Sequence, residues 1–427
     1  MLKKGILFLL LFVVLSISGQ TRIKTMFYNT LNYDANTESQ NRTIHLKMIL
    51  EAVQPDLFMI CELKNETASD YLYENAIVSN LSNFNKAPFN DSQSPATDLL
   101  QMVYYNTAKL ILKSTKVIPT GIRDINRYTF TINTEDSATN PITLEVFVTH
   151  LKASTGSDNR LKRYNSILNF LDELDTLPSD SFVLFSGDFN FYTSNEDGFR
   201  VLTDRRNNIK IIDPIDRPAN QFPNNSNVGD PFEFYSSSSN YFWRHSSFAD
   251  IQTQSTRTSQ LNGDGAGGGM DDRFDFILMS ENFNTDTNLY YVKDSYKTIG
   301  NNGNCYNSFV SNTSCHGVYS QELRNALYEF SDHLPVVMSI ETPKNTLSIS
   351  KNYHPISFSS TNIVKNSITL ALKETVNSII IYNLLGQIVY QQKNNSRTEL
   401  TIDTSTFSKG IYFLKTDSYT PLKFVKN

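Results

Sequence analysis

The chain has 427 residues, of which 39% are hydrophobic, 12% aromatic and 19% charged. This composition excludes a disordered or collagen-like chain, and the length exceeds what one compact core usually holds, so we expect two folded units. The formal net charge of −5 argues against a protein that holds nucleic acid chiefly through a basic surface, although it does not exclude nucleic acid as a substrate.

Residues 1–20 have the pattern of a signal peptide. Lys3 and Lys4 precede an apolar run from Gly5 to Ser18, and Gly19 is a small residue at the expected cleavage site. The run is shorter than the roughly 20 apolar residues of a membrane-spanning helix, and no second run of this kind follows. We therefore expect an exported protein without stable membrane insertion.

The segments that follow alternate between strand-like and helix-like patterns. Helices are predicted over residues 40–53 and 159–175. Their predicted buried stripes are Ile44, Met48 and Val53 in the first helix, and Leu161, Tyr164, Leu168, Leu171 and Leu174 in the second. Strand-like runs occupy residues 22–29, 57–61, 99–106, 109–117, 142–150, 181–190, 271–280 and 331–340. This mixture predicts an α/β sandwich in which helices cover the sheets.

Within the second helix, Arg160, Lys162 and Arg163 form a basic group shortly after His150. A solvated helix face explains such a group, and contact with a polyanion is the alternative.

Cysteine positions and loop composition give further expectations. Cys305 and Cys315 lie in a stretch rich in Gly, Asn and Ser, and in an exported protein we expect a disulfide between them, with two free thiols as the alternative. Cys61 lies in an apolar run and is expected to be a buried, unreactive thiol. Residues 217–240 and 262–269 read as long surface loops.

After residue 342 the pattern changes. Residues 343–354 read as a polar linker, and residues 355–427 contain only short alternating strands, with Gly386 in a hairpin turn. This part predicts a small all-β sandwich. The expected organisation is therefore a signal peptide (1–20), a large domain (21–342), a linker (343–354) and the small β domain (355–427).

Polar residues stand at or beside the ends of many of the apolar runs. They are Asn29, Glu62, His150, Asp188, Asn190, Asp275, Asp332 and His333. A carboxylate at a strand end is by itself more often a cap or a surface charge. Together, however, they supply the oxygen ligands that Mg²⁺ prefers and the base and phosphate contacts that phosphoryl transfer needs.

Six segments carry a resemblance to a known family. In chain order, "FYNTLNYD", "PDLFMICEL", "VTHLKAS", "SGDFN", "DRFDFIL" and "SDHLPV" resemble the motifs of the endonuclease/exonuclease/phosphatase superfamily, over about residues 21–340. The resemblance implies a four-layered α/β sandwich, with two packed β-sheets flanked by helices. It also implies metal-dependent cleavage of phosphodiesters.

The resemblance further implies roles for single residues. Glu62 would be the principal ligand of Mg²⁺, with Mn²⁺ or Ca²⁺ as alternatives, and Asn29 and Asp332 would assist it. His333 would be the general base, oriented by Asp275.

The other catalytic positions would contact the substrate or the attacking water. His150 would contact the scissile phosphate, while Asp188 and Asn190 would orient the water and hold a phosphate oxygen. A phosphate-contacting tyrosine and arginine are matched by Tyr105 and Arg127, with Tyr104 and Arg123 as alternatives.

The C-terminal segment, with "IYNLLGQ" and "KGIYFLK", resembles the type A sorting domain of the type IX secretion system, although it lacks a "PNP" start. The sequence thus predicts a secreted or cell-surface, monomeric endonuclease that cleaves DNA or RNA and is exported by the type IX machinery. One alternative is a sphingomyelinase-like phospholipid phosphodiesterase, for which Tyr241, Phe242 and Trp243 are a candidate apolar hairpin or, equally, a buried strand. The other is a non-catalytic adhesion module, for which the acidic and histidine set has no physical need.

Overall fold

The computed structural model describes residues 20–95, 99–219, 243–346, 356–359, 362–372, 376–395, 399–416 and 422–427. The chain divides into two compact units, Met1–Ser348 and Ile349–Asn427. The expected signal peptide, apart from Gln20, and most of the loop at 217–240 lie outside the described residues. None of the described helices is long and apolar enough to cross a membrane.

The larger unit contains two mixed β-sheets. The first has the order β11-β13-β1-β2-β4-β3, with β12 also paired to β13, and the second has the order β5-β6-β7-β8-β10-β9. The strands of the first sheet are β1 (Thr21–Tyr33), β2 (Leu57–Leu63), β3 (Phe84–Lys86), β4 (Leu100–Asn106), β11 (Tyr290–Tyr291), β12 (Lys297–Thr298) and β13 (Val336–Thr342). Those of the second are β5 (Leu110–Ile118), β6 (Ile125–Ile132), β7 (Thr143–His150), β8 (Phe182–Asp188), β9 (Ile211–Ile212) and β10 (Asp275–Ser280).

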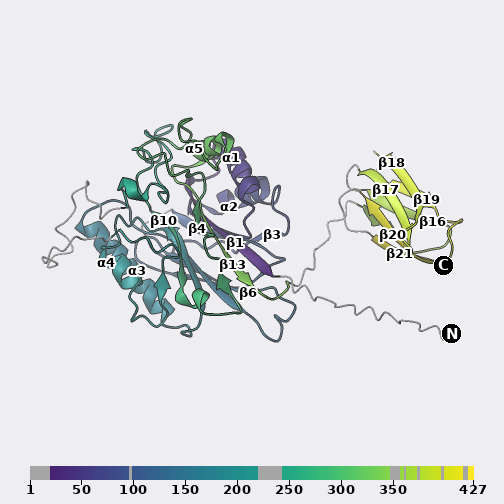
Figure 1. The fold of residues 1–427 in the computed structure, drawn as a ribbon, viewed down its shortest axis with the longest axis horizontal. Coiled ribbons are helices and arrows are strands. Elements are labelled where there is room, and N and C mark those ends of the chain that lie inside the picture. The colour runs from purple at the N-terminus through teal and green to yellow at the C-terminus, as the bar shows by residue number, and fades with distance from the viewer. Residues whose placement is uncertain are drawn as a thin grey trace, which may run out of the picture. The chain divides into compact units, whose positions relative to one another are not determined.

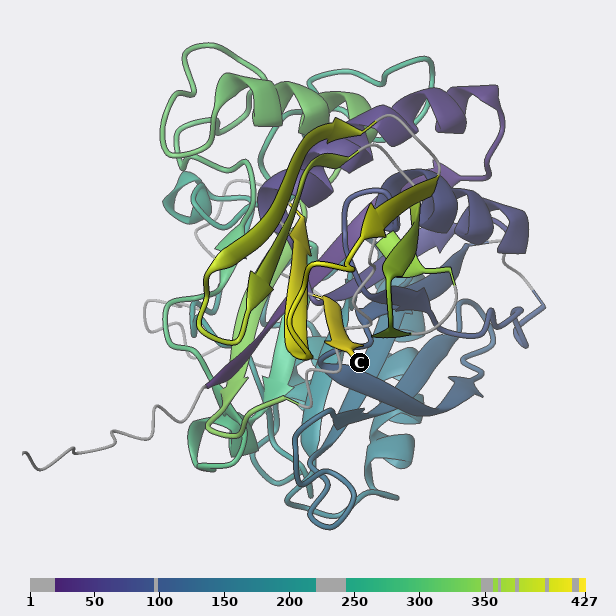
Figure 2. The same ribbon diagram turned by 90° about the vertical axis from the view of Figure 1, so that its right-hand side faces the viewer.

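Helices cover the outer face of each sheet. The helices are α1 (Thr37–Val53), α2 (Glu66–Leu72), α3 (Ser157–Leu174), α4 (Asp197–Leu202) and α5 (Gln321–Phe330). Figure 1 shows α3 and α4 on one side of the sheets and α1 and α2 on the other, and α1 packs against α5 (Figure 2). Between the helices the sheets face each other, since β1 contacts β8 and β10, and β2 contacts β7. The structure confirms the predicted four-layered α/β sandwich.

A parallel strand pair at the centre of each sheet determines where the polar strand ends meet. In the first sheet α1 connects the parallel strands β1 and β2, and in the second α3 connects β7 and β8. The antiparallel neighbours begin where these pairs end: Asp275 of β10 lies opposite Asp188, and β13 starts at Val336, opposite Phe27. The ends of β2, β7 and β8 and the starts of β10 and β13 therefore gather at one edge of the sandwich.

The first helix is present, but only part of its predicted stripe is buried: Val53 is buried as predicted, and Met48 is partly buried against the core. The helix begins three residues earlier, at Thr37, because the Asn36 side chain accepts a hydrogen bond from the backbone N–H of Ser39 and caps the helix. Ile44 is 58% exposed. The apolar residues that the helix buries are Leu46, Ile49, Leu50 and Val53.

The second helix buries Leu174 as predicted, but it also buries an arginine that the predicted stripe did not include. Leu161 is 54% exposed, whereas Arg163 is buried with Ile167 and Phe170. The Arg163 guanidinium pairs with Glu196, with Nη2 2.8 Å from Oε2. A stripe counted from apolar residues alone misses a face that an ion pair stabilises.

Both cysteine predictions are confirmed. Cys305 and Cys315 form a disulfide with their Cα atoms 5.3 Å apart. Cys61 is free and buried, and burial raises the pKa of its thiol well above the ordinary value. The disulfide-closed loop pairs with the preceding loop, since Met270 N donates to Ser308 O.

The smaller unit is all β, as predicted. Its two sheets have the orders β14-β16-β19 and β15-β21-β20-β17-β18. The strands are β14 (Ile356–Phe358), β15 (Ile363–Val364), β16 (Ser367–Leu372), β17 (Val376–Asn383), β18 (Ile388–Asn395), β19 (Glu399–Asp403), β20 (Gly410–Thr416) and β21 (Leu422–Lys426). Leu370 and Ile381, one from each sheet, share a core, and Gly386 turns the β17–β18 hairpin at φ 76°.

The buried ion pair of α3 gives a stability prediction. Arg163→Ala should lower the free energy of unfolding by about 3–5 kcal/mol, because it leaves Glu196 buried without its partner. The neighbouring Lys162 is exposed, so Lys162→Ala should change stability by less than about 0.5 kcal/mol. Urea denaturation of the two variants measures both values, and equal effects would contradict the assigned role of Arg163.

Candidate active site

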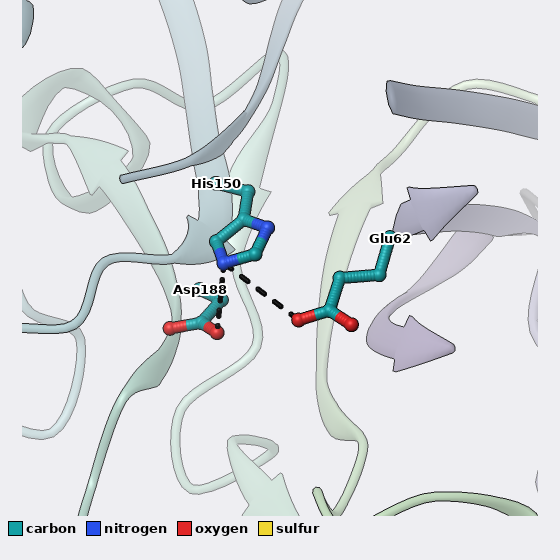
Figure 3. Close-up of side chains that lie close together, drawn as sticks. All are labelled: Glu62, His150 and Asp188. Carbon is teal, nitrogen blue, oxygen red and sulfur yellow. Dashed lines mark ion pairs between the residues drawn. The ribbon is translucent and has the colours of Figure 1, made fainter. Parts of the chain in front are cut away.

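The shared edge of the two sheets joins polar residues from both. From β1, Asn29 donates through Nδ2 to Glu62 Oε1 at 2.9 Å and to Asp188 Oδ2 at 3.1 Å. Figure 3 shows the His150 imidazole with Nε2 directed between the carboxylates of Asp188 and Glu62, at 3.5 and 3.7 Å. The first sheet provides Asn29 and Glu62, and the second provides His150 and Asp188.

An irregularity in β2 directs Glu62 toward this cluster. The pairing of β2 with β1 and with β4 shifts register around this residue, and Glu62 itself has the left-handed φ of 60°. Such a bulge changes the direction of a side chain relative to the regular alternation of a strand. The backbone N–H of Asn32 then holds the carboxylate, donating to Oε2 at 3.0 Å. The Glu62 side chain is 14% exposed, against 3% for Asp188, so Glu62 is the more solvent-accessible of the two.

Asn190 fixes the orientation of Asp188. Its backbone N–H and its Nδ2 donate to Asp188 Oδ1 at 3.1 and 2.8 Å, which Asn190 reaches with a left-handed φ of 51°. The other oxygen, Oδ2, therefore faces Asn29, His150 and His333. The structure thus places Asn190 as the support of Asp188.

His333 and Asp275 lie together as a buried pair. Nδ1 of His333 is 2.7 Å from Asp275 Oδ2, and Asp275 is fully buried. With Nδ1–H donating to the carboxylate, Nε2 faces the cluster, 3.7 Å from Asp188 Oδ2. The chemistry of an imidazole held in this way is proton transfer at Nε2.

Residues that the sequence analysis missed support Asp332 and His333. Asp332 Oδ2 accepts from the backbone N–H of Ala266 at 2.7 Å and from Gln254 Nε2 at 3.1 Å. The same Gln254 Nε2 is 2.6 Å from His333 Nε2. Gln254 and Ala266 lie in a loop rather than at the end of an apolar run. A search for polar residues at the ends of predicted strands therefore could not find them.

Carboxylates crowd the site. Burial, followed by the charge of Asp332, raises the pKa of Glu62, while the hydrogen bond from Asn29 opposes the rise. Burial also raises the pKa of Asp188 to about 8, although the charge of His333 lowers it. Each of these carboxylates is therefore less acidic than an exposed one, and a nearby cation would favour its charged form.

The two histidines respond in opposite directions. Burial, followed by the charges of Arg123 and His333, lowers the pKa of His150 well below its ordinary value. Burial would also lower the pKa of His333, but three neighbouring carboxylates raise it well above the ordinary value. They are Asp275, Asp332 and Asp188.

The residues present fit a divalent cation. Ligand atoms of Glu62, His150 and Asp188 lie within 4.8 Å of one another, and so do those of Asp188, Asp275 and His333. Asp332, whose charge raises the pKa of Glu62, has a buried Oδ1 without a protein partner. Carboxylate oxygens that lie this close together suit a hard ion such as Mg²⁺.

Tyr105 and Arg127 are not brought to the cluster. Tyr105 lies opposite Leu57, at the far end of β2 from Glu62, and its ring packs against Phe130. Its alternative, Tyr104, is bonded to Ser69 in the core.

Arg127 points to the outer face of the second sheet, where it pairs with Glu145 at 2.9 Å and with Glu173 at 2.8 Å. Its alternative, Arg123, does lie beside the site. Nη1 of Arg123 donates to the backbone oxygen of Leu151 at 2.8 Å, one residue after His150.

A comparison with models of protein families agrees with the resemblance of the C-terminal segment. Residues 362–426 match the family model described as "Secretion system C-terminal sorting domain". This confirms the predicted sorting domain and indicates export. No curated protein sequence matches the chain.

Solved structures similar to the chain include TDP2 from D. rerio complexed with single strand DNA product, at 14% identity, covering 75% of this chain and 99% of that one with a TM-score of 0.44. The human Nocturnin catalytic domain with bound sulfate matches at 13% identity and a TM-score of 0.44, and the match covers 75% of this chain and 97% of that one. A protein from Bacteroides thetaiotaomicron matches at 12% identity, 76% and 99% coverage and a TM-score of 0.44. That protein is described as an endonuclease/exonuclease/phosphatase family protein.

The crowded carboxylates predict that a divalent cation stabilises the protein. Mg²⁺ at about 100 times its dissociation constant should add about 2.7 kcal/mol to the free energy of unfolding, and the melting temperature should rise with it. Glu62→Gln should remove most of this gain, because it removes one charge from the ligand set. Thermal melting with Mg²⁺ and with chelator measures the difference. An equal Mg²⁺ response in the variant would contradict the assignment of Glu62.

Proposed function

We propose that residues 21–342 are a metal-dependent phosphodiesterase of the endonuclease/exonuclease/phosphatase superfamily. The observation that carries the proposal is the buried His333–Asp275 pair, at 2.7 Å, facing a carboxylate cluster that joins two sheets. A buried imidazole on a carboxylate suits proton transfer, and clustered carboxylates suit a cation that neutralises a phosphate.

The base in this proposal is His333. Asp275 holds Nδ1–H and stabilises the imidazolium, so Nε2 takes the proton of the attacking water. Only the neutral imidazole accepts a proton, and the pKa of His333 is raised by carboxylates whose charge a bound cation would offset. Gln254 Nε2 lies 2.6 Å from the same His333 Nε2, so this amide would have to give way when the water binds there.

The remaining residues hold the substrate and the cation. Glu62, assisted by Asp332, would hold Mg²⁺, or Mn²⁺ or Ca²⁺ in its place, and the ion would supply charge neutralisation at the phosphate. Asn29 would assist through Glu62, because its Nδ2 faces the carboxylates and its Oδ1 accepts from Leu31 N at 3.0 Å. His150, kept neutral by its lowered pKa, contacts the scissile phosphate through Nε2. Asp188 orients the water, and Asn190 keeps its Oδ2 directed at the cluster.

We propose DNA or RNA as the substrate and an endonucleolytic mode of cleavage. The phospholipid alternative needs an exposed apolar hairpin, yet Trp243 is buried against Phe199 and Phe276. The other two residues of that candidate, Tyr241 and Phe242, lie outside the described residues. An adhesion module has no physical use for a buried His–Asp pair.

Export is the second part of the proposal. The matched sorting domain supports delivery by the type IX secretion system, after a signal peptide at 1–20, to the cell surface or the medium. We propose that the exported enzyme acts as a monomer.

Loss of the base is the first functional test. His333→Ala should lower kcat on bis(p-nitrophenyl) phosphate with Mg²⁺ by about 10²–10⁴-fold, because the attacking water loses its proton acceptor. The matched control is His316→Ala, which removes an exposed histidine that directly follows the disulfide and should leave kcat unchanged. Full activity of the His333 variant, or activity of the wild type in chelator, would refute the mechanism.

Loss of the sorting domain tests export. Deletion of residues 355–427 removes most of the smaller compact unit, so the protein should remain inside the producing cell and keep its activity in lysates. Immunoblots of cell and medium fractions measure this. The full-length His333→Ala protein serves as control, since it should be exported although inactive. Export of the truncated chain would show that the signal lies elsewhere.

A further inference from the structure

The backbone around His333 lies beside a loop segment, residues 253–256. The regular pairing of β13 with β1 begins only at Val336, beyond His333 in the chain. Before that point, Gln254 forms an isolated antiparallel bridge with His333. The segment 253–256 therefore takes the place that a neighbouring strand would have beside the base.

Thr253 connects the two members of the His333–Asp275 pair. Its side chain is fully buried, and its Oγ1 accepts from the backbone N–H of Asp275 at 3.2 Å. Its backbone oxygen accepts from the N–H of Leu334, the residue after His333, at 2.7 Å. One residue thus holds the backbone on both sides of the 2.7 Å contact between Asp275 Oδ2 and His333 Nδ1.

Thr256 holds the backbone that carries Asp332. Its N–H donates to Asp332 O at 3.0 Å, and its Oγ1 donates to Ser331 O at 2.6 Å. Thr256 is fully buried, so neither hydrogen bond is open to solvent. Thr253 and Thr256 together hold the chain on both sides of His333.

The disulfide-closed loop, residues 305–315, supports Thr256 through its backbone oxygen. Val310 N donates to Thr256 O at 2.9 Å. Val310 is fixed in turn by the buried Arg324 of α5, whose Nη1 donates to Val310 O and to Asn312 O, both at 2.8 Å. A continuous series of hydrogen bonds therefore leads from the loop through Thr256 to the backbone of Asp332.

A glycine makes a second contact between this loop and the segment. Gly269 O accepts from Ser255 N at 2.8 Å. Gly269 has a φ of 89° and packs so closely on the loop that a Cβ there would lie 2.5 Å from the carbonyl carbon of Asn307. Because only glycine permits this approach, the loop packs directly on the residue that supports Ser255.

The conformation of the loop depends on its crosslink. In the described range 243–346, no helix or strand falls between β12 and α5, so regular structure does not fix residues 305–315. Cys305 and Cys315 close the loop, and both are buried. A crosslink limits the conformations open to the chain that it closes. Loss of the disulfide should therefore loosen the loop and, with it, the support of Thr256.

We infer that Thr253 and Thr256 are positioning residues for the base, and that the disulfide-closed loop acts on the site through Thr256. This inference rests on the proposed function of His333 and extends it to residues that do not touch the reacting atoms. Turnover then depends on the disulfide, because displacement of a reacting group by about 1 Å can lower a rate by about a hundredfold. The dependence suits an exported enzyme, since disulfides persist in oxidising surroundings.

Four variants of the full-length protein separate positioning from stability. Cys305→Ser with Cys315→Ser opens the loop. Thr256→Val removes the hydroxyl donor to Ser331 O, whereas Thr256→Ser keeps it. The control is Arg127→Ala, which breaks two ion pairs on the outer face of the second sheet and so lowers stability away from the site.

Turnover of bis(p-nitrophenyl) phosphate with Mg²⁺ is measured at a temperature at which melting curves show every variant folded. The disulfide-free variant and Thr256→Val should each lower kcat by about tenfold to a hundredfold and change KM by less than about threefold, because the base is displaced while the binding contacts remain. Thr256→Ser and Arg127→Ala should keep the wild-type kcat.

A loop that only stabilised the fold would lower the melting temperature and leave kcat unchanged. Wild-type kcat in the disulfide-free variant or in Thr256→Val would therefore overturn the inference, and so would an equal loss of kcat in Arg127→Ala. If the disulfide-free protein does not fold, Thr256→Val and its serine counterpart decide the question.

Hydrogen exchange gives a measurement that does not need activity. The Leu334 amide, which donates to Thr253 O, should exchange about tenfold faster in the disulfide-free variant than in Arg127→Ala, because the opening is local to the loop and the base. Equal exchange in these two variants would overturn the inference. Faster exchange together with an inactive wild-type protein would retain the connection between loop and His333 and refute the phosphodiesterase.

Discussion

The structure depends on holding several carboxylates close together at one edge of two packed sheets. Burial raises the pKa of Asp188 to about 8, and the charges of Asp275 and Glu62 add to the rise. Strand topology enforces the proximity, because the parallel pairs β1–β2 and β7–β8 end at the same edge as β10 begins. The amide of Asn29 bridges Glu62 and Asp188, one from each sheet, and so connects the sheets at the point of repulsion.

Backbone conformation, as well as side-chain chemistry, holds the carboxylates in place at this edge. Glu62 and Asn190 both have left-handed φ angles, which cost a non-glycine residue roughly 1–2 kcal/mol. In each case the conformation brings hydrogen bonds to a carboxylate of the cluster: Asn32 N reaches Glu62, and Asn190 N reaches Asp188. Local strain of this kind persists where the surrounding structure overdetermines it, and it is concentrated at functional sites.

The sequence predicted the residues of the cluster better than their supports. Polar residues that end apolar runs are conspicuous, and strand topology then places Glu62, His150 and Asp188 side by side. Gln254 reaches His333 from a loop whose course depends on the disulfide-closed loop beside it, which no periodicity reveals. Arg127 was predicted to contact the phosphate because of its position between the motifs. The alternation of side chains along β6 instead directs it toward Glu145 and Glu173.

His150 lies between two carboxylates and a cation. On one side are the carboxylates of Glu62 and Asp188, and on the other is the cation Arg123, held on Leu151 O. Burial and the nearby cations keep the imidazole neutral, so His150 adds no charge to either side.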